Sequence, residues 1–250
     1  MRRQPWLRKC IYVDAFAGVG QYLDPEEQDY VDGSPLVALA SDPPFDQYYF
    51  IDADESRLAS LREHVQRTFP GKLPVFACGD ANTVLRETVC PAVSYGRYER
   101  GFVFLDPYGL QVELSTVQQL AHTKVFDVLV NLSVMGINRL LQRDQWPDSA
   151  TLNILGRVMG DTTWLEDVYS RQQDLFGEER VLRPRLAPAA VAKLYLDRIR
   201  KFFPYVSDPL LMTNSRDAPL YILFSASHNE TAKKITDDIF ARYLSRLARS

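Results

Sequence analysis

The chain has 250 residues, of which 46% are hydrophobic and 24% charged, with a formal net charge of -3. This length can bury a substantial core and fits one α/β domain with an insertion as readily as two small domains. The composition is ordinary for a soluble globular protein, and the negative net charge argues against a surface covered by cations. Contact with nucleic acid would therefore require a local basic patch.

The cysteine pattern and the apolar runs bear on metal binding and location. Cys10, Cys78 and Cys90 show neither a C-x-x-C pair nor a histidine at metal-ligand spacing. We therefore predict reduced, buried thiols and no metal site. No apolar stretch approaches the roughly 20 residues of a membrane span, and the charged N-terminal segment is not followed by the apolar core of a leader peptide. These features predict a cytoplasmic protein.

Short apolar runs in the first half of the chain predict buried strands, because each is apolar on both faces. The runs lie at 11–16, 47–51, 75–78, 102–105 and 125–132. A helix is predicted to open with Ser34 as its N-cap and Pro35 in its first turn, and another covers 56–65. Strands that alternate with helices indicate βαβ units and a parallel sheet.

The pattern changes after residue 133. Residues 136–187 are mixed in polarity, include Trp146 and Trp164, and are predicted to form a helical insertion, a cap beside the substrate pocket of a single domain over 1–250. A helix is predicted over 188–203, a strand over 220–224 with a weaker partner over 209–213, and a last helix over 230–247. The whole predicts a doubly wound, Rossmann-like α/β fold, mostly parallel, with a terminal antiparallel hairpin.

Glycines follow the first predicted strand at a place where ligands bind. In an open parallel sheet, ligands lie beyond the carboxyl ends of the strands. The first end is Asp14-Ala15-Phe16-Ala17-Gly18-Val19-Gly20, and Gly18 and Gly20 let the backbone turn tightly and approach a ligand, although a plain turn accounts for them equally. No third glycine completes a dinucleotide fingerprint and no Lys-Ser/Thr of a phosphate loop follows, which counts against NAD and ATP.

The next two strand ends carry carboxylates. Asp52 can accept two hydrogen bonds from a ribose diol, or it can cap the helix that follows, for which Asp54 is the better placed residue. Asp80, followed by Ala81, offers an acceptor suited to an adenine amino group, or is simply part of a turn.

The fourth strand end, Asp106-Pro107-Tyr108-Gly109, is the most specific of the series. An aspartate with a neighbouring carbonyl can accept both hydrogens of an exocyclic amino group, and Tyr108 supplies a flat face on which a base could stack. The alternative is a turn with proline as its breaker. Four such ends in order favour a cofactor and acceptor site. Asn131, at the fifth end, either positions the substrate or is a polar strand terminus.

These segments together resemble one family. Seven segments resemble the three-Cys-motif partner proteins. They are residues 12–20, 33–36, 50–52, 104–109, 130–131, 135–139 and 223–227. The resemblance covers nearly the whole chain and is weakest from 145 to 187. Members look like class I methyltransferases that use S-adenosylmethionine. The family is named for a neighbouring protein with a three-cysteine motif, which implies a partner but defines no substrate.

The resemblance implies roles for individual residues. It puts the ends of the first three strands on the cofactor and the fourth at the methyl acceptor. The implied cofactor residues are Asp14, Phe16, Gly18, Gly20, Asp52, Asp80 and Ala81, and the implied acceptor residues are Asp106, Pro107 and Tyr108, to which position alone adds Asn131. The Asp-Pro-Tyr-Gly motif is similar to the D-P-P-Y of amino-group methyltransferases and the D-P-F-G of tRNA guanine methyltransferases. It lacks the second proline of D-P-P-Y, which leaves amines other than adenine open.

A basic stretch in the second half leaves the acceptor undecided. Its cations are either a phosphate-contacting surface or the solvated face of a helix. They are Arg180, Arg183, Arg185, Lys193, Arg198, Arg200 and Lys201. Three hypotheses follow: an amino-group methyltransferase acting on nucleic acid, a methyltransferase acting on a protein or small molecule with the three-cysteine partner, and a non-catalytic subunit that binds the cofactor or only the partner.

Overall fold

The computed structural model describes residues 4–23, 29–141, 145–173, 179–182 and 188–247, with the backbone alone for 167, 170–173, 179–182 and 188–189. The chain divides into two compact units. The first unit is Met1–Asp106 with Gln119–Leu129, and the second is Pro107–Gln118 with Val130–Ser250. Helix α5 (Leu114–Thr123) and strand β7 (Phe126–Leu132) contribute residues to both units.

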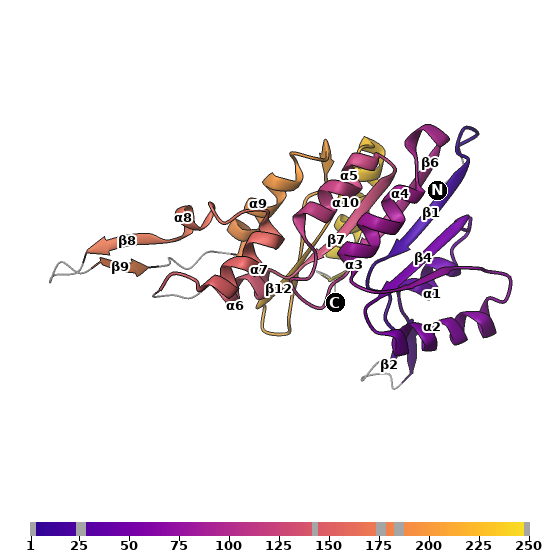
Figure 1. Ribbon diagram of the computed structural model, residues 1–250, viewed down its shortest axis with the longest axis horizontal. Helices are drawn as coiled ribbons and strands as arrows, with labels where there is room; N and C mark the ends of the chain where they lie inside the picture. Colours follow the sequence, from indigo (N-terminus) through magenta and orange to yellow (C-terminus); the bar gives the residue numbers. More distant parts are fainter. Residues whose placement is uncertain (1–3, 24–28, 142–144, 174–178, 183–187, 248–250) are drawn as a thin grey trace. The chain divides into compact units, whose positions relative to one another are not determined.

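The first unit is built on a mostly parallel sheet, shown in indigo to magenta in Figure 1. Its strands are β1 (Lys9–Asp14), β4 (Gln47–Asp52), β5 (Val75–Cys78) and β6 (Glu99–Leu105). Strand β1 pairs in parallel with β4 and with β6, and β4 pairs in parallel with β5. The order is β7-β6-β1-β4-β5, so the carboxyl ends of β6, β1, β4 and β5 meet at one edge. This confirms the predicted α/β class with a parallel sheet.

Helices cover this sheet, and an aromatic core lies between the sheet and two of the helices. Helix α1 (Ser34–Leu39) contacts β1, and α2 (Glu55–Thr68) contacts β4 and β5. A further helical stretch runs through α3 (Ala81–Val84), the π-helical η1 (Leu85–Val89) and α4 (Cys90–Ala92), and the 3₁₀ turn η2 (Tyr95–Arg97) precedes β6. The core under α1 and α2 is rich in aromatic rings, with Tyr12 stacked on Phe102 at a centroid distance of 6.1 Å.

The two predicted helix starts have different outcomes. Asp54 caps α2 as expected, because its Oδ1 accepts hydrogen bonds from the backbone of Ser56 at 2.8 Å and of Arg57 at 3.3 Å. The prediction of Ser34 as a cap was wrong. Gly33 is the N-cap of α1 and gives no side-chain bond, while the Ser34 hydroxyl donates to Asp14. A buried carboxylate needs donors, and it engages this hydroxyl.

The acidic stretch after the first strand contains a short hairpin that the sequence did not predict. Strand β2 (Gln21–Leu23) pairs antiparallel with β3 (Tyr30–Asp32). Gln21 Nε2 donates to Asp32 Oδ1 at 2.8 Å across the pair. Strands of three residues are too short to show a period-2 pattern, so composition alone indicated only turns.

The second unit contains helices and antiparallel strands. Strand β12 (Pro219–Ser227) pairs antiparallel with β11 (Leu210–Thr213) and with β10 (Tyr205–Val206), which confirms the predicted hairpin and adds a strand. Helices α6 (Val134–Leu140), α9 (Pro188–Ile199) and α10 (Glu230–Leu247) pack on β12, with Tyr195 edge-on to Phe224. Among the described helices, none combines the length and apolar character that crossing a membrane requires.

The segment 136–187 is only partly helical. Helices α7 (Ser149–Met159) and α8 (Leu165–Val168) match the expectation, but β8 (Ser170–Gln173) and β9 (Glu179–Leu182) form an antiparallel pair, labelled in Figure 1. The prediction of helix was wrong for these strands. Their mixed polarity carries no helical period, and cross-strand pairing satisfies the backbone groups. The role of the segment as a cap stays a prediction.

Candidate cofactor site

The loop after β1 lies against the end of β4. The backbone N–H of Ala17 donates to the Ile51 carbonyl at 2.8 Å, and that of Gly18 donates to Asp52 Oδ2 at 2.9 Å. Gly18 has a φ of +60°, and nothing lies within 4 Å of a Cβ added at this position. The loop therefore presents backbone to open space, and a side chain at Gly18 would fill that space.

Gly20 has a different role from Gly18. It has a φ of +84°, and an added Cβ would lie 2.5 Å from Leu61 Cδ1 of α2. Its carbonyl accepts a hydrogen bond of 2.7 Å from Gly33, the N-cap of α1. Gly20 is thus required by packing between the loop and two helices, irrespective of any cofactor contact.

Asp14, the last residue of β1, is fully buried. Its carboxylate accepts from the Tyr12 hydroxyl at 3.2 Å, from the backbone of Phe16 at 3.3 Å and from the Ser34 hydroxyl. Burial raises the pKa of Asp14 to about 6 despite these hydrogen bonds, and the charge of Asp106 raises it further. The ends of β1 and β6 thus bring two acidic groups into electrostatic contact within the first unit.

Asp52 joins the β1 loop to the end of β4. Its side chain is 8% exposed, with Oδ2 accepting from Gly18 and Oδ1 from the backbone of Asp54 at 2.9 Å. Asp54, not Asp52, caps α2. Each carboxylate oxygen has two lone pairs, so Asp52 can accept further hydrogen bonds from a diol while holding the loop.

Asp80 is the N-cap of α3 and Ala81 is its buried first residue. The Asp80 carboxylate accepts from the backbone and hydroxyl of Thr83, at 2.9 Å and 3.1 Å. Partial burial opposes ionisation, but hydrogen bonds from Thr83 and Asn82 hold the pKa of Asp80 below its ordinary value. The capping role is therefore real in this structure, and a contact with adenine stays a prediction.

Cys78, just before this cap, is exposed, whereas Cys10 and Cys90 are buried. The prediction of a buried thiol was wrong for Cys78 because β5 is the outermost strand of the sheet on its side. No group of three or more potential metal ligands occurs in the part of the chain that the structure describes.

The predicted acceptor residues are divided between the units. Asp106 directly follows β6, is exposed and belongs to the first unit. In the second unit Pro107 is buried, Tyr108 exposes 88% of its surface and Asn131 is partly buried in β7. The backbone N–H of Tyr108 donates to Gln111 Oε1 at 3.1 Å. Their joint action on one acceptor stays a prediction.

The basic stretch is only partly described. Arg183 and Arg185 lie outside the described residues, and the side chain of Arg180 is not described. Arg198 is 13% exposed and pairs with Asp161 at 3.0 Å, whereas Arg200 pairs with Asp197 at 2.9 Å. Arg198 thus holds α9 to the segment before α8, and Lys201 is exposed.

Two residues of the candidate site were not predicted from the sequence. Tyr12 and Ser34 both donate to Asp14. Tyr12 precedes Asp14 by two positions, and such residues share one face of a strand, so period-2 spacing was an available signal. The Ser34 contact joins residues from separate elements, and local sequence gave no sign of it.

The chain was also compared with known proteins. No protein-family model and no curated protein matches it. Similar solved structures include Trm1 from Pyrococcus horikoshii in complex with S-adenosyl-L-methionine, which is 13% identical with a TM-score of 0.47, over 91% of this chain and 53% of that chain. An S-adenosylmethionine-dependent methyltransferase from Clostridium acetobutylicum is 12% identical with a TM-score of 0.39, over 88% of this chain and 85% of the other. A putative enzyme of the same description from Listeria monocytogenes is 11% identical with a TM-score of 0.41, over 91% and 94%. Since these TM-scores are below 0.5, the assignment of fold rests on the strand order and pairing of the chain itself.

Proposed function

We propose that this chain binds S-adenosylmethionine at the carboxyl ends of β1, β4 and β5 and transfers its methyl group to an amino nitrogen. The main support is the junction of Gly18 and Asp52, where a 2.9 Å hydrogen bond joins the glycine loop to a buried carboxylate beside open space. In parallel α/β sheets this edge is the ligand-binding edge. A nucleoside fits the donors and acceptors present.

Each group at this edge has a chemical counterpart in the cofactor. Asp52 would accept hydrogen bonds from the ribose hydroxyls, and the Gly18 backbone would approach the ligand where no side chain intervenes. The loop that follows Asp14 would lie against the methionine moiety, with the buried Asp14 carboxylate holding the Phe16 backbone and with Gly20 shaping the loop. Asp80 and Ala81 would lie toward the adenine.

The acceptor amine would be oriented by Asp106. A methyl sulfonium is transferred by in-line displacement, so the enzyme mainly supplies proximity and alignment. A neutral amine needs no strong base, and the Asp106 carboxylate would stabilise the positive charge that develops on nitrogen. Tyr108, with 88% of its surface exposed, offers a face for stacking, and Asn131 would help to position the substrate.

A base in nucleic acid is the acceptor we favour, because Asp106-Pro107-Tyr108-Gly109 pairs an amine acceptor with an exposed ring. The second candidate function is methyl transfer to a protein or small molecule that a three-cysteine partner presents. In a variant of this candidate, the chain is a non-catalytic subunit of such a pair. The second candidate is favoured by the net charge of -3 and by the ion pair that occupies Arg198. Labelled methyl uptake by nucleic acid, or by protein from cells that express the chain with its partner, separates the two.

Calorimetry with the purified chain tests the cofactor itself. We expect binding of S-adenosylmethionine and of its demethylated product, each titrated in the range of about 1 mM or below. An absence of heat with both ligands, together with tight binding of NAD or ATP, would remove the methyltransferase proposal.

A further inference from the structure

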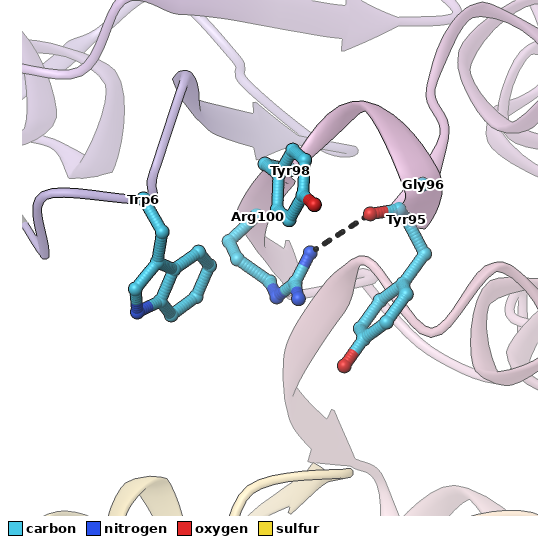
Figure 2. A pocket seen from close by; sticks show the side chains of 5 residues that line it. All are labelled: Trp6, Tyr95, Gly96, Tyr98 and Arg100. Carbon is cyan, nitrogen blue, oxygen red and sulfur yellow. Dashed lines mark hydrogen bonds between the residues drawn. The ribbon is translucent and has the colours of Figure 1, made fainter.

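An aromatic cluster surrounds an arginine at the end of β6 opposite the cofactor edge. Arg100 is the second residue of β6, and Asp106 follows the last residue of the same strand. Trp6, Tyr95, Gly96, Tyr98 and Arg100, which we call the Arg100 cluster, line a hollow of about 420 Å³. Figure 2 shows the guanidinium between the rings of Trp6 and Tyr95, with Tyr98 beside it.

The guanidinium is held by rings and backbone. Its Cζ lies 3.7 Å from the centroid of Tyr95 and 5.0 Å from that of Trp6. One terminal nitrogen donates to the Glu99 carbonyl at 2.6 Å and to the Tyr95 carbonyl at 3.5 Å, the latter dashed in Figure 2. In the described part of the chain no carboxylate forms an ion pair with Arg100, and the nearby Glu99 carboxylate binds Arg97 at 3.0 Å. Arg100 is thus a positioned cation that retains donors for an anion.

The rings of the cluster are about half open to solvent. Trp6, Tyr95 and Tyr98 are exposed by 46%, 50% and 53%. Tyr98 has a left-handed backbone, with φ 59° and ψ 35°, in which a bulky residue is uncommon and glycine would be unstrained. A large aromatic side chain is therefore displayed at a position where the backbone disfavours it, which is a pattern associated with function.

The two segments that build the cluster are basic although the chain is acidic. Residues 4–10 and 94–100 contain Arg8, Lys9, Arg97 and Arg100 but a single acid, Glu99, in a chain of net charge -3. The backbone N–H of Arg8 donates to the Tyr98 carbonyl at 3.0 Å, which places the two segments side by side. The two segments that carry the exposed rings therefore hold an excess of cations, of which Arg100 lines the hollow.

We propose that the Arg100 cluster is a binding site for single-stranded nucleic acid, with a phosphate on Arg100 and bases stacked on Trp6 and Tyr98. Exposed rings interleaved with cations are the means by which single strands are held without sequence preference. A duplex hides its base faces, and a proline-rich peptide would leave the cations without counter-charges. The site goes beyond methyl transfer, since binding there requires neither the cofactor nor Asp106.

Fluorescence anisotropy tests this site by measuring how tightly the purified chain, without cofactor, binds labelled oligo-dT and oligo-U of about 10 nucleotides. We expect both to bind more tightly than a duplex of equal length, and less tightly as salt increases. Trp6→Ala and Tyr98→Ala should each weaken binding roughly ten-fold, and Tyr98→Phe should restore it. Arg100→Gln should lower the slope of log affinity against log salt by about 0.7, whereas Arg100→Lys keeps the slope. Tighter binding of oligo-U than of oligo-dT would identify the single strand that binds this site as RNA.

Matched controls are an exposed ring and an exposed cation elsewhere. Tyr30→Ala, at a position 67% exposed, and Arg246→Gln on α10 should leave binding unchanged. The proposal is overturned if neither strand binds at low salt, if the duplex binds equally well, or if Tyr98→Ala binds like the parent with the same melting temperature. Binding of a proline-rich peptide in place of the oligonucleotides overturns it too. Each of these failures leaves cofactor binding, measured by calorimetry, as an independent result.

Discussion

Asp14 makes the stability of the protein depend on pH. Burial raises its folded-state pKa to about 6, whereas an aspartate in an unfolded chain has a pKa near 4. The folded state therefore binds the proton more tightly, and the stability contributed by this group is full below about pH 4 and is lost as the pH rises through about 6. The difference in unfolding free energy between the parent and Asp14→Asn should fall by about 3 kcal/mol over that window. Urea unfolding at a series of pH values measures it, and a difference that rises instead would contradict the burial argument.

Asp52 should matter for cofactor affinity more than for folding. Asp52→Ala would remove the two hydrogen bonds that we propose to the ribose, so we expect binding of S-adenosylmethionine to weaken by roughly 2–3 kcal/mol in calorimetry. The matched control is Asp54→Ala, which removes the cap of α2 and should lower stability by about 1 kcal/mol while sparing affinity. Equal affinity losses in the two variants would assign Asp52 to folding alone.

Asp106 is expected to act on the acceptor and not on the cofactor. Asp106→Asn keeps the shape and one acceptor oxygen but loses the negative charge, and should reduce the rate of methyl transfer by about 10²–10³. Cofactor affinity should change little, because the proposed cofactor contacts come from the ends of β1, β4 and β5. Tyr108→Phe should cost little if the ring acts by stacking. Loss of cofactor binding in Asp106→Asn, with turnover per bound cofactor intact, would place this residue in the cofactor pocket.

At the scale of elements, the two glycines of the loop between β1 and β2 have different roles, Gly18 in cofactor binding as we propose and Gly20 in packing. Gly18→Ala puts a Cβ into open space, so we expect a stability loss of about 1 kcal/mol from the left-handed backbone and a marked loss of cofactor affinity. Gly20→Ala adds the same backbone strain and forces a Cβ to within 2.5 Å of Leu61. It should therefore lower the unfolding free energy by about 2–3 kcal/mol more than Gly18→Ala does. Thermal unfolding and calorimetry on the pair measure both effects, and a larger stability loss in Gly18→Ala would contradict this division.

The elements themselves were predictable where their patterns were long enough. Strands β1, β4, β5 and β6, the antiparallel pair β11 and β12, and helix α10 all appear where the sequence predicted them, because each strand is a readable apolar run and the helix shows its period over several turns. The pairs β2–β3 and β8–β9 were missed, since three or four residues of mixed polarity carry no readable period.

At the scale of the whole molecule, the distribution of charge could not be deduced from the total. A net charge of -3 gave no indication that Arg100 lies among Trp6, Tyr95 and Tyr98. The sequence indicated the basic stretch from Arg180 to Lys201 as a possible phosphate-contacting surface. In the structure, however, Arg198 is mostly buried and forms an ion pair with Asp161. Residues 6 and 100 are far apart in the chain, and β-sheet pairing is what brings their segments together.

The sequence by itself determined the parallel strands of the first unit and the placement of Asp14, Asp52 and Asp106 at the carboxyl ends of their strands. It could do so because strand periodicity and βαβ order depend on neighbouring residues and fix the edge at which each strand ends. Only the tertiary structure decided that Ser34 donates to Asp14, that Gly20 is needed for packing on Leu61, and that Arg100 lies between two rings. Those contacts join segments distant in sequence, and their geometry is set by how the elements pack.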